Sequence, residues 1–212
     1  YREFPRVDRI EISDRSDVRI IEVDPQVVVV ASGVEAGLVS PSTKFTLPPS
    51  IRVADRVIHE AHRSGTERMT VAEVLSRSSN VGTITLAELL GRSRLETWIE
   101  RFGFGHRTGI DFPGETSGIL PFYWSGSTIG TLPIGHGIAV TPVQMAAAYG
   151  AVANGGVWLR PRLVADRPAK RRRVMSRRVA NQLMSMLRDV VIEGTGTEAA
   201  IPGYTVAGKT GT

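Results

Sequence analysis

The chain has 212 residues, of which 42% are hydrophobic and 22% are charged, a composition that suits one globular domain with a buried core. It contains no cysteine, which excludes a disulfide framework and cysteine-ligated zinc. The net charge is +5, but the basic run KRRR at residues 170–173 has no interleaved aromatic residues. We therefore expect this run to be a solvated loop, and we expect no nucleic acid as a partner.

The first quarter of the chain predicts one buried element between less regular segments. Residues 1–26 are charged and loosely alternating, with RIEIS and DVRIIEV as strand-like pieces, and we expect a linker or the remnant of an upstream domain there. The apolar segment VVVVASGVEAG that follows predicts a buried helix. Prolines predict a loop over PSTKFTLPPS, and residues 51–65 predict a short strand or a loop.

Capping signals predict a run of three helices in the next part of the chain. Thr70 and Glu73 form a capping box that opens the first helix, which ends near Ser78. A second helix is predicted over residues 81–90. The third is predicted over residues 93–103, with a serine as its N-cap.

The second half of the chain alternates loops with further predicted elements. Residues 104–140 are rich in glycine and proline, which predicts a structured functional loop region. Thr141 followed by proline opens the next helix, and Ser176 opens the last one. Residues 157–164 and 204–212 predict strands, because apolar and β-branched residues recur in them.

The segment GYTVAGKTGT at residues 203–212 matches two incompatible motifs. One is G-x-x-x-x-G-K-[ST], the phosphate-binding P-loop, and the other is K-T-G, a motif of serine enzymes that recognise penicillin. A P-loop needs a buried strand before its first glycine, yet the preceding residues EAAIP form a poor strand. The β-branched and aromatic residues at 204–206 also favour an extended segment. We therefore reject the P-loop.

The K-T-G motif gains meaning only together with partner motifs. Residues Ser78, Ser79 and Asn80 supply S-x-N in a short loop between two predicted helices. Taken alone, Asn80 is more simply interpreted as the N-cap of the helix that follows. In combination with K-T-G on a late strand, the pair of motifs favours a functional site.

Longer blocks extend this pattern over most of the chain. They are VAEVLSRSSNVGTITLAELLG, FGFGHRTGIDFPGE, GTLPIGHGIAVTPVQMAAAYGAVANGG and GTGTEAAIPGYTVAGKTGT. With these blocks, the chain resembles the transpeptidase domain of class B (monofunctional) penicillin-binding proteins of the cell-division type, from about residue 31 to residue 212. The resemblance implies an α/β fold of the α+β type, like that of serine β-lactamases, with an antiparallel sheet flanked by helices. It places a partial transpeptidase domain at residues 27–212.

The resemblance also implies a reaction. In this family a serine attacks the penultimate D-Ala carbonyl of a peptidoglycan stem peptide, and an amine then attacks the acyl-enzyme. The catalytic candidates are Ser78, which would relay a proton to the leaving group, and Lys209, which would hold positive charge beside it. Asn80 would hydrogen-bond the substrate amide.

The residues after Lys209 are candidates for binding the substrate. By the resemblance, the Thr210 and Thr212 hydroxyls would bind its carboxylate, the Thr212 N–H would be an oxyanion donor, and Gly211 would let it lie against the strand edge. Implied partners are stem peptides, β-lactam antibiotics and membrane proteins of a division complex. The implied location is the extracytoplasmic side of a bacterial cell membrane, with neither a cofactor nor a metal.

The family's first motif, S-x-x-K, is missing. The sequence has three lysines, Lys44, Lys170 and Lys209, and none follows a serine by three positions. Counting back from the ASGVEAG block places the lysine slot at Gln26 and the serine slot at Val23. Either the protein is an inactive relative, or the sequence joins segments of a longer protein and omits the nucleophile. We expect the second, with a break in the backbone between residues 24 and 28.

Several other features have simpler interpretations. His59 and His62 are three positions apart rather than the four of H-E-x-x-H, so we expect surface histidines and no zinc site. Tyr123 and Trp124 would either line the substrate cleft or pack in the core. His136 is expected to support the loop before the helix that starts at Thr141.

Two other functions stay open at this point. A serine β-lactamase or β-lactam sensor shares all three motifs, although the GTLPIGHGIAVTPVQMAAAYGAVANGG block resembles the transpeptidases. A non-catalytic scaffold of a division complex would need no nucleophile.

Overall fold

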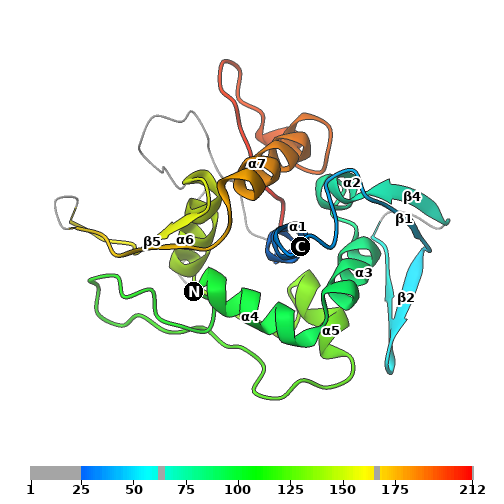
Figure 1. The fold of residues 1–212 in the computed structure, drawn as a ribbon, viewed down its shortest axis with the longest axis horizontal. Coiled ribbons are helices and arrows are strands. Elements are labelled where there is room, and N and C mark those ends of the chain that lie inside the picture. Colours follow the sequence, from blue (N-terminus) through cyan, green and yellow to red (C-terminus); the bar gives the residue numbers. More distant parts are fainter. Residues whose placement is uncertain (1–24, 62–64, 165–167, 212) are drawn as a thin grey trace, which may run out of the picture.

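The computed structural model describes residues 25–61, 65–164 and 168–211, and Figure 1 shows how their helices and strands are arranged. The helices are α1 (Gln26–Glu35), α2 (Val71–Ser76), α3 (Asn80–Leu90), α4 (Arg92–Phe102), α5 (Thr128–Thr131), α6 (Pro142–Ala153) and α7 (Arg177–Ile192), with short 3₁₀ turns η1 (Leu132–Ile134) and η2 (Thr197–Ala199). The strands are β1 (Lys44–Leu47), β2 (Ser50–Val53), β3 (Arg56–His59), β4 (Glu67–Thr70), β5 (Val157–Leu159) and β6 (Arg171–Arg173). The strand-like pieces predicted before residue 24, and the upstream side of the expected break, lie outside these ranges. Between residues 25 and 28 the expected break is wrong, because the Val28 N–H donates to the Pro25 carbonyl at 2.9 Å within the first turn of α1.

Helix α1 forms the centre of the core. Every residue from Gln26 to Val34 is buried, which is typical of a helix that is apolar on all sides. Four consecutive valines are poor at starting a helix, so burial among neighbouring elements must stabilise this one. The predicted buried helix is therefore confirmed.

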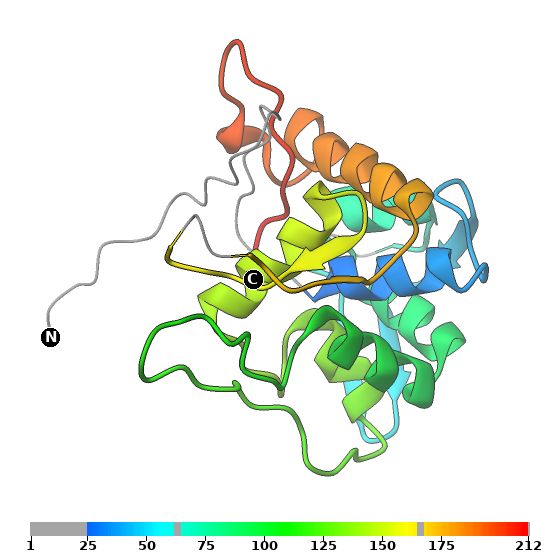
Figure 2. The same cartoon turned by 60° about the vertical axis from the view of Figure 1, so that its left-hand side comes forward.

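Several other helices pack around α1. It contacts α3, α4 and α7, and Figure 1 shows α7 above it and α4 below it. Helix α7 is amphipathic, and its buried side includes Val179, Leu183, Met186 and Val190, as the spacing of its apolar residues predicts. In Figure 2, α7 runs across the top of α6 and α1. The core thus lies between helices rather than on a broad sheet.

The strands form three separate antiparallel pairs within the described ranges. Strand β1 pairs with β4, β2 with β3, and β5 with β6. The helix-and-antiparallel-sheet fold class is confirmed, but as small ribbons rather than one continuous sheet. The loop predicted from the prolines at 41–50 is wrong for β1, because these prolines flank the strand and leave its backbone free to pair with β4.

The strand predicted over residues 204–212 is not formed in residues 204–211, the part that the structure describes. A β-strand needs a neighbouring strand for its backbone groups, and this segment pairs with none in the described part of the chain. The Gly208 N–H instead donates to the Leu187 carbonyl of α7, at 3.1 Å. Residues Val206, Ala207 and Lys209 are nevertheless buried, so the segment is held in place by α7 and by side-chain burial.

Most predicted helix starts are confirmed. Thr70 and Thr141 form complete capping boxes at α2 and α6. The predicted N-cap Ser93 is wrong by two residues, because the N-cap of α4 is Gly91, which also ends α3. Its φ of +80° belongs to the region that favours glycine and turns the chain at once into the next helix.

Candidate active site

The S-x-N residues form the turn between α2 and α3. Helix α2 ends at Ser76, and Ser79 is the N-cap of α3, where its hydroxyl accepts a hydrogen bond from the Gly82 N–H at 3.0 Å. Ser78 lies between the two helices with a φ of +55°, a left-handed conformation that costs free energy for a residue with a Cβ. Such strain, held by the surrounding structure, is common at functional sites.

Lys209 reaches this turn from the far end of the chain. Its Nζ donates a hydrogen bond to Ser78 Oγ at 2.7 Å, across 131 positions of sequence. The lysine is only 1% exposed, and Nζ also donates to the Thr210 carbonyl at 3.0 Å. A buried ammonium needs such acceptors because it has lost water. The predicted proximity of the S-x-N serine and the K-T-G lysine is confirmed.

Gln26 contacts the same hydroxyl. It is the first residue of α1, it is fully buried, and its Nε2 donates to Ser78 Oγ at 3.2 Å. The lysine slot of S-x-x-K, counted from the sequence, therefore lies directly at Ser78. A glutamine there supplies a hydrogen-bond donor but no titratable group, so it cannot accept a proton as an amine can. Val23, the serine slot, lies outside the described residues.

Asn80 begins α3 on the other side of Ser79. Its side-chain Nδ2 donates to the His59 carbonyl at 3.3 Å. Asn80 also lines an open cavity of about 410 Å³ with His59, Thr131 and His136 among the other walls. Asn80 is therefore accessible for hydrogen bonding to a ligand, and His136 borders the same cavity, a position not expected from the sequence.

The residues after Lys209 are only partly described. The Thr210 and Thr195 hydroxyl oxygens lie 2.7 Å apart, and Thr210 Oγ1 is 3.4 Å from the Lys209 Nζ. Gly211 is exposed, and Thr212 lies outside the described residues, so its predicted roles stay predictions. The sequence does not predict Thr195 as a site residue, because no neighbouring motif indicates it. It is placed here by its N–H, which donates to the Ser76 carbonyl at 3.0 Å.

Glu60 is a second residue that sequence reasoning missed. In the sequence it stands only between His59 and His62 of the rejected zinc pattern, yet its carboxylate accepts hydrogen bonds from Ser79 Oγ at 2.5 Å and from the Val81 N–H at 3.0 Å. These donors belong to the turn that carries Ser78. His62, the other end of that motif, lies outside the described residues.

A capping box begins α2, the helix that ends just before this turn. The Glu73 carboxylate accepts from the Thr70 N–H at 2.7 Å, and the Thr70 hydroxyl accepts from the Glu73 N–H at 3.1 Å. The hydrogen bonds from the Thr70 backbone and side chain hold the pKa of Glu73 below its ordinary value, so the carboxylate is ionised at neutral pH.

Of the two aromatic candidates, only Trp124 packs in the core. It is 8% exposed, and the Arg92 guanidinium lies 5.4 Å from the centre of its ring. Tyr123 is 77% exposed and belongs to the surface of the 104–140 loop. Trp124 is thus a packing residue, and neither aromatic lines the cavities at Ser78 and Asn80.

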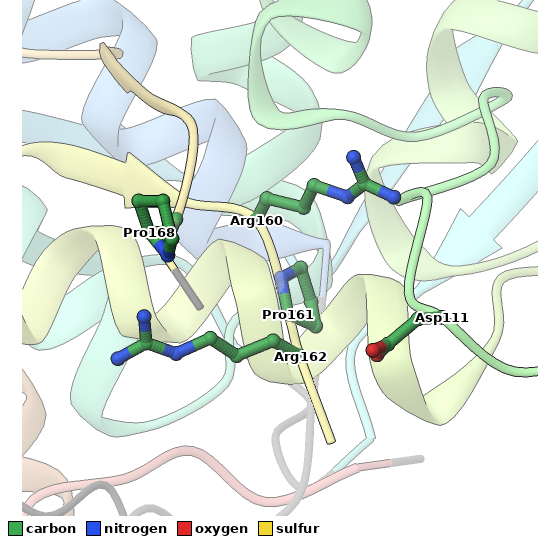
Figure 3. A pocket seen from close by; sticks show the side chains of 6 residues that line it. Asp111, Arg160, Pro161, Arg162 and Pro168 are labelled. Carbon is green, nitrogen blue, oxygen red and sulfur yellow. The ribbon is translucent and has the colours of Figure 1, made fainter. Parts of the chain in front are cut away.

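The basic run belongs to a hairpin away from Ser78. Residues of the run form β6, which pairs with β5, so the loop predicted there is wrong, although its arginines are exposed as expected. A cavity of about 110 Å³ near this hairpin is lined by Asp111, Arg160, Pro161, Arg162, Pro168 and Ala169 (Figure 3). Arg160 donates to the Gly109 carbonyl and the Leu163 N–H to Asp111, which ties the hairpin to the 104–118 loop.

The sequence of this chain is similar to those of known proteins. Residues 26–212 match the family model of the penicillin binding protein transpeptidase domain, and the chain therefore belongs to this family. Penicillin-binding protein PbpB of Mycolicibacterium smegmatis is 39% identical over 208 residues, which cover 88% of this chain and 32% of that protein. Peptidoglycan D,D-transpeptidase FtsI of Escherichia coli is 33% identical over 195 residues, which cover 90% of this chain and 32% of that protein.

Solved structures are similar over the same region. Penicillin binding protein 3 from Mycobacterium tuberculosis, complexed with ampicillin, is 38% identical, with a TM-score of 0.84 over 89% of this chain and 46% of that chain. Its complex with aztreonam gives the same values. The chain spans about a third of the length of the curated relatives it matches. Among the described residues, no helix combines the length and apolar character needed to cross a membrane.

Proposed function

We propose that this chain carries the second and third motifs of a peptidoglycan D,D-transpeptidase that works through an acyl-serine intermediate. The observation behind the proposal is the contact between Lys209 Nζ and Ser78 Oγ at 2.7 Å. The lysine and the serine hydroxyl together can pass a proton to a leaving amine, while the positive charge attracts a substrate carboxylate. Asn80 hydrogen-bonds the substrate amide, and Thr210, Gly211 and Thr212 hold its C-terminal carboxylate.

The nucleophile belongs to the segment that precedes α1 in the whole protein. Gln26, at the start of α1, already contacts Ser78 Oγ at 3.2 Å, so a serine one helical turn before it would lie at the same site. The substrates are stem peptides ending in D-Ala-D-Ala, β-lactams are inhibitors, and the site faces the extracytoplasmic side of a bacterial membrane. The relatives named FtsI and PbpB support a place beside division proteins.

The test is acylation of the whole protein with a fluorescent penicillin, followed by peptide mapping of the label. The proposal expects a stable label on a serine shortly before α1. Loss of the label within seconds would favour the serine β-lactamase alternative, because a lactamase releases the acyl group. Complete absence of label from the whole protein would favour the non-catalytic scaffold.

A further inference from the structure

Glu60 holds the turn that carries the candidate active-site residues. It follows strand β3, and its carboxylate accepts hydrogen bonds from Ser79 Oγ at 2.5 Å, the Val81 N–H at 3.0 Å and the Asn80 N–H at 3.3 Å. All three donors belong to the S-x-N turn or to the first turn of α3. One side chain from a distant hairpin therefore binds three consecutive residues.

The arrangement extends an ordinary helix cap. The first N–H groups of a helix have no partner within it, and in α3 the Gly82 N–H is satisfied by Ser79 Oγ at 3.0 Å. Because the Ser79 hydroxyl has a single proton and donates it to Glu60, its lone pairs point toward Gly82. The Glu60 carboxylate also places negative charge at the positive end of an 11-residue helix.

This network fixes both functional neighbours of Ser79. Ser78 keeps a left-handed φ of +55°, which the surrounding contacts must hold against its intrinsic preference. Asn80 is bound twice, by Glu60 at its N–H and by the His59 carbonyl at its side chain, 3.3 Å from Nδ2. The backbone of Asn80 is therefore held by Glu60, and its side-chain amide by the adjacent His59.

We propose that Glu60 is a positioning residue, which orients Asn80 and Ser78 for ligand binding through its hydrogen bonds to the S-x-N turn. The part of this proposal that concerns the ligand rests on the proposed function. The part that concerns the turn does not, because it is a statement about the chain alone.

A matched control lies in the same cavity. Glu60, Glu67, Arg77, Ser78 and Ser79 are among the residues that line a cavity of about 160 Å³. The Glu67 carboxylate pairs with Arg77 Nη1 at 2.5 Å and has no hydrogen bond to Ser79, Asn80 or Val81 among those described. Glu67→Gln therefore removes one negative charge from the same cavity, while the donors of the S-x-N turn keep their acceptor, the Glu60 carboxylate.

The first experiment measures amide hydrogen exchange by NMR in the wild-type chain, Glu60→Gln, Glu60→Ala and Glu67→Gln. Loss of this part-buried acceptor should speed exchange of the Asn80 and Val81 amides about tenfold or more in Glu60→Ala. Glu60→Gln, which keeps one oxygen and the side-chain volume, should show a smaller increase, and Glu67→Gln should match the wild type. Unchanged exchange in both Glu60 variants would overturn the proposal.

The second experiment measures the affinity of the folded variants for a peptide ending in D-Ala-D-Ala, well below their melting temperatures. Glu60→Ala should bind about tenfold more weakly, and Glu67→Gln as the wild type does. A purely structural role would lower the melting temperature and leave the affinity unchanged, which would overturn the positioning role. If Glu60→Ala does not fold, both the exchange rates and the affinity are measured on Glu60→Gln.

The two experiments separate this proposal from the proposed function. If the wild-type chain binds no such peptide, that result counts against ligand recognition by this chain and so against the proposed function. The exchange rates of Asn80 and Val81 then decide for or against Glu60 without reference to any ligand.

Discussion

The amine of Lys209 and the hydroxyl of Ser78 lie 2.7 Å apart, although one residue is near the end of the chain and the other is in its first half. The lysine is almost completely buried and holds this contact together with the Thr210 carbonyl. Removing a buried ammonium from water is costly unless its hydrogen bonds are replaced. The fold therefore supports a charged group at the Ser78 hydroxyl, and this arrangement can be tested by substitution.

Lys209→Ala should slow the acylation of the whole protein by penicillin about 10²-fold or more, the scale for losing one electrostatic or proton-relay group. The rate is measured with a fluorescent penicillin under pseudo-first-order conditions. Lys170→Ala is the matched control, because Lys170 is exposed and lies next to β6, away from Ser78. An acylation rate that is equal in the two variants would remove Lys209 from the mechanism.

The 212-residue chain itself should form no covalent adduct with penicillin. Gln26 occupies the lysine slot of S-x-x-K at Ser78, and the sequence has no serine three positions before any lysine. Gln26→Lys should also give no adduct, because it adds an amine without a nucleophile. Intact-mass spectrometry after incubation with penicillin measures this directly. A mass increase on any serine of the chain would show that the nucleophile has been misassigned.

Gly82→Ala should weaken the packing of α3 on α2. A Cβ at this position would lie 2.5 Å from Val74 Cγ2 and 2.9 Å from Ser79 Oγ, so the helices would have to separate. We expect a loss of about 1–3 kcal/mol in the free energy of unfolding, the usual cost of overpacking. Urea unfolding at neutral pH measures it. Val74→Ala combined with Gly82→Ala removes the contact, and if the double variant recovered no stability relative to additivity, the clash would not be the cause.

Glu115→Gln should destabilise the 104–140 loop in a pH-dependent way. Burial opposes ionisation of this carboxyl, but hydrogen bonds from the Thr108 hydroxyl and the Thr108 and Gly109 N–H groups outweigh it, so the pKa of Glu115 lies below its ordinary value of 4.5. A lowered carboxyl pKa means stabilisation that is complete above pH 4.5 and is lost as the pH falls through the folded-state pKa.

The difference between Glu115→Gln and wild type should therefore be about 1.5–3 kcal/mol at pH 7, the scale of a hydrogen bond to a charged group, and should shrink in acid. Chemical unfolding at a series of pH values measures it. The exposed Glu88→Gln variant is the control for a change of charge alone. A difference between Glu115→Gln and wild type that stays constant with pH would contradict the assignment.

Local signals in the sequence predicted the helices well. The side chains of Thr70 and Thr141 accept hydrogen bonds from N–H groups in the first turns of their helices. Donor and acceptor are three positions apart in the sequence, so a short stretch of sequence is enough to predict the cap. The run of four valines in α1 likewise predicts a buried helix, whichever elements of the fold cover it.

The sequence could not show features that depend on distant partners. Residues 204–210 have strand-forming composition, but whether a strand forms depends on another strand, and here α7 supplies the backbone contact instead. Glu60 reaches Ser79 from 19 positions away, so no short pattern connects it to the S-x-N motif. The pairing of Ser78 with Lys209 was predictable only because two known motifs occur in one chain.

The position of α1 has a consequence for substitutions far from the site. The valines of this helix fill the centre of the core, and its first residue, Gln26, contacts Ser78. Because a packed core transmits a change in volume rather than absorbing it, a smaller side chain at Val30 would shift the helix along its neighbours and move its first residue relative to Ser78. A substitution deep in the core, which no ligand contacts, would thereby alter ligand affinity although every residue of the site is unchanged.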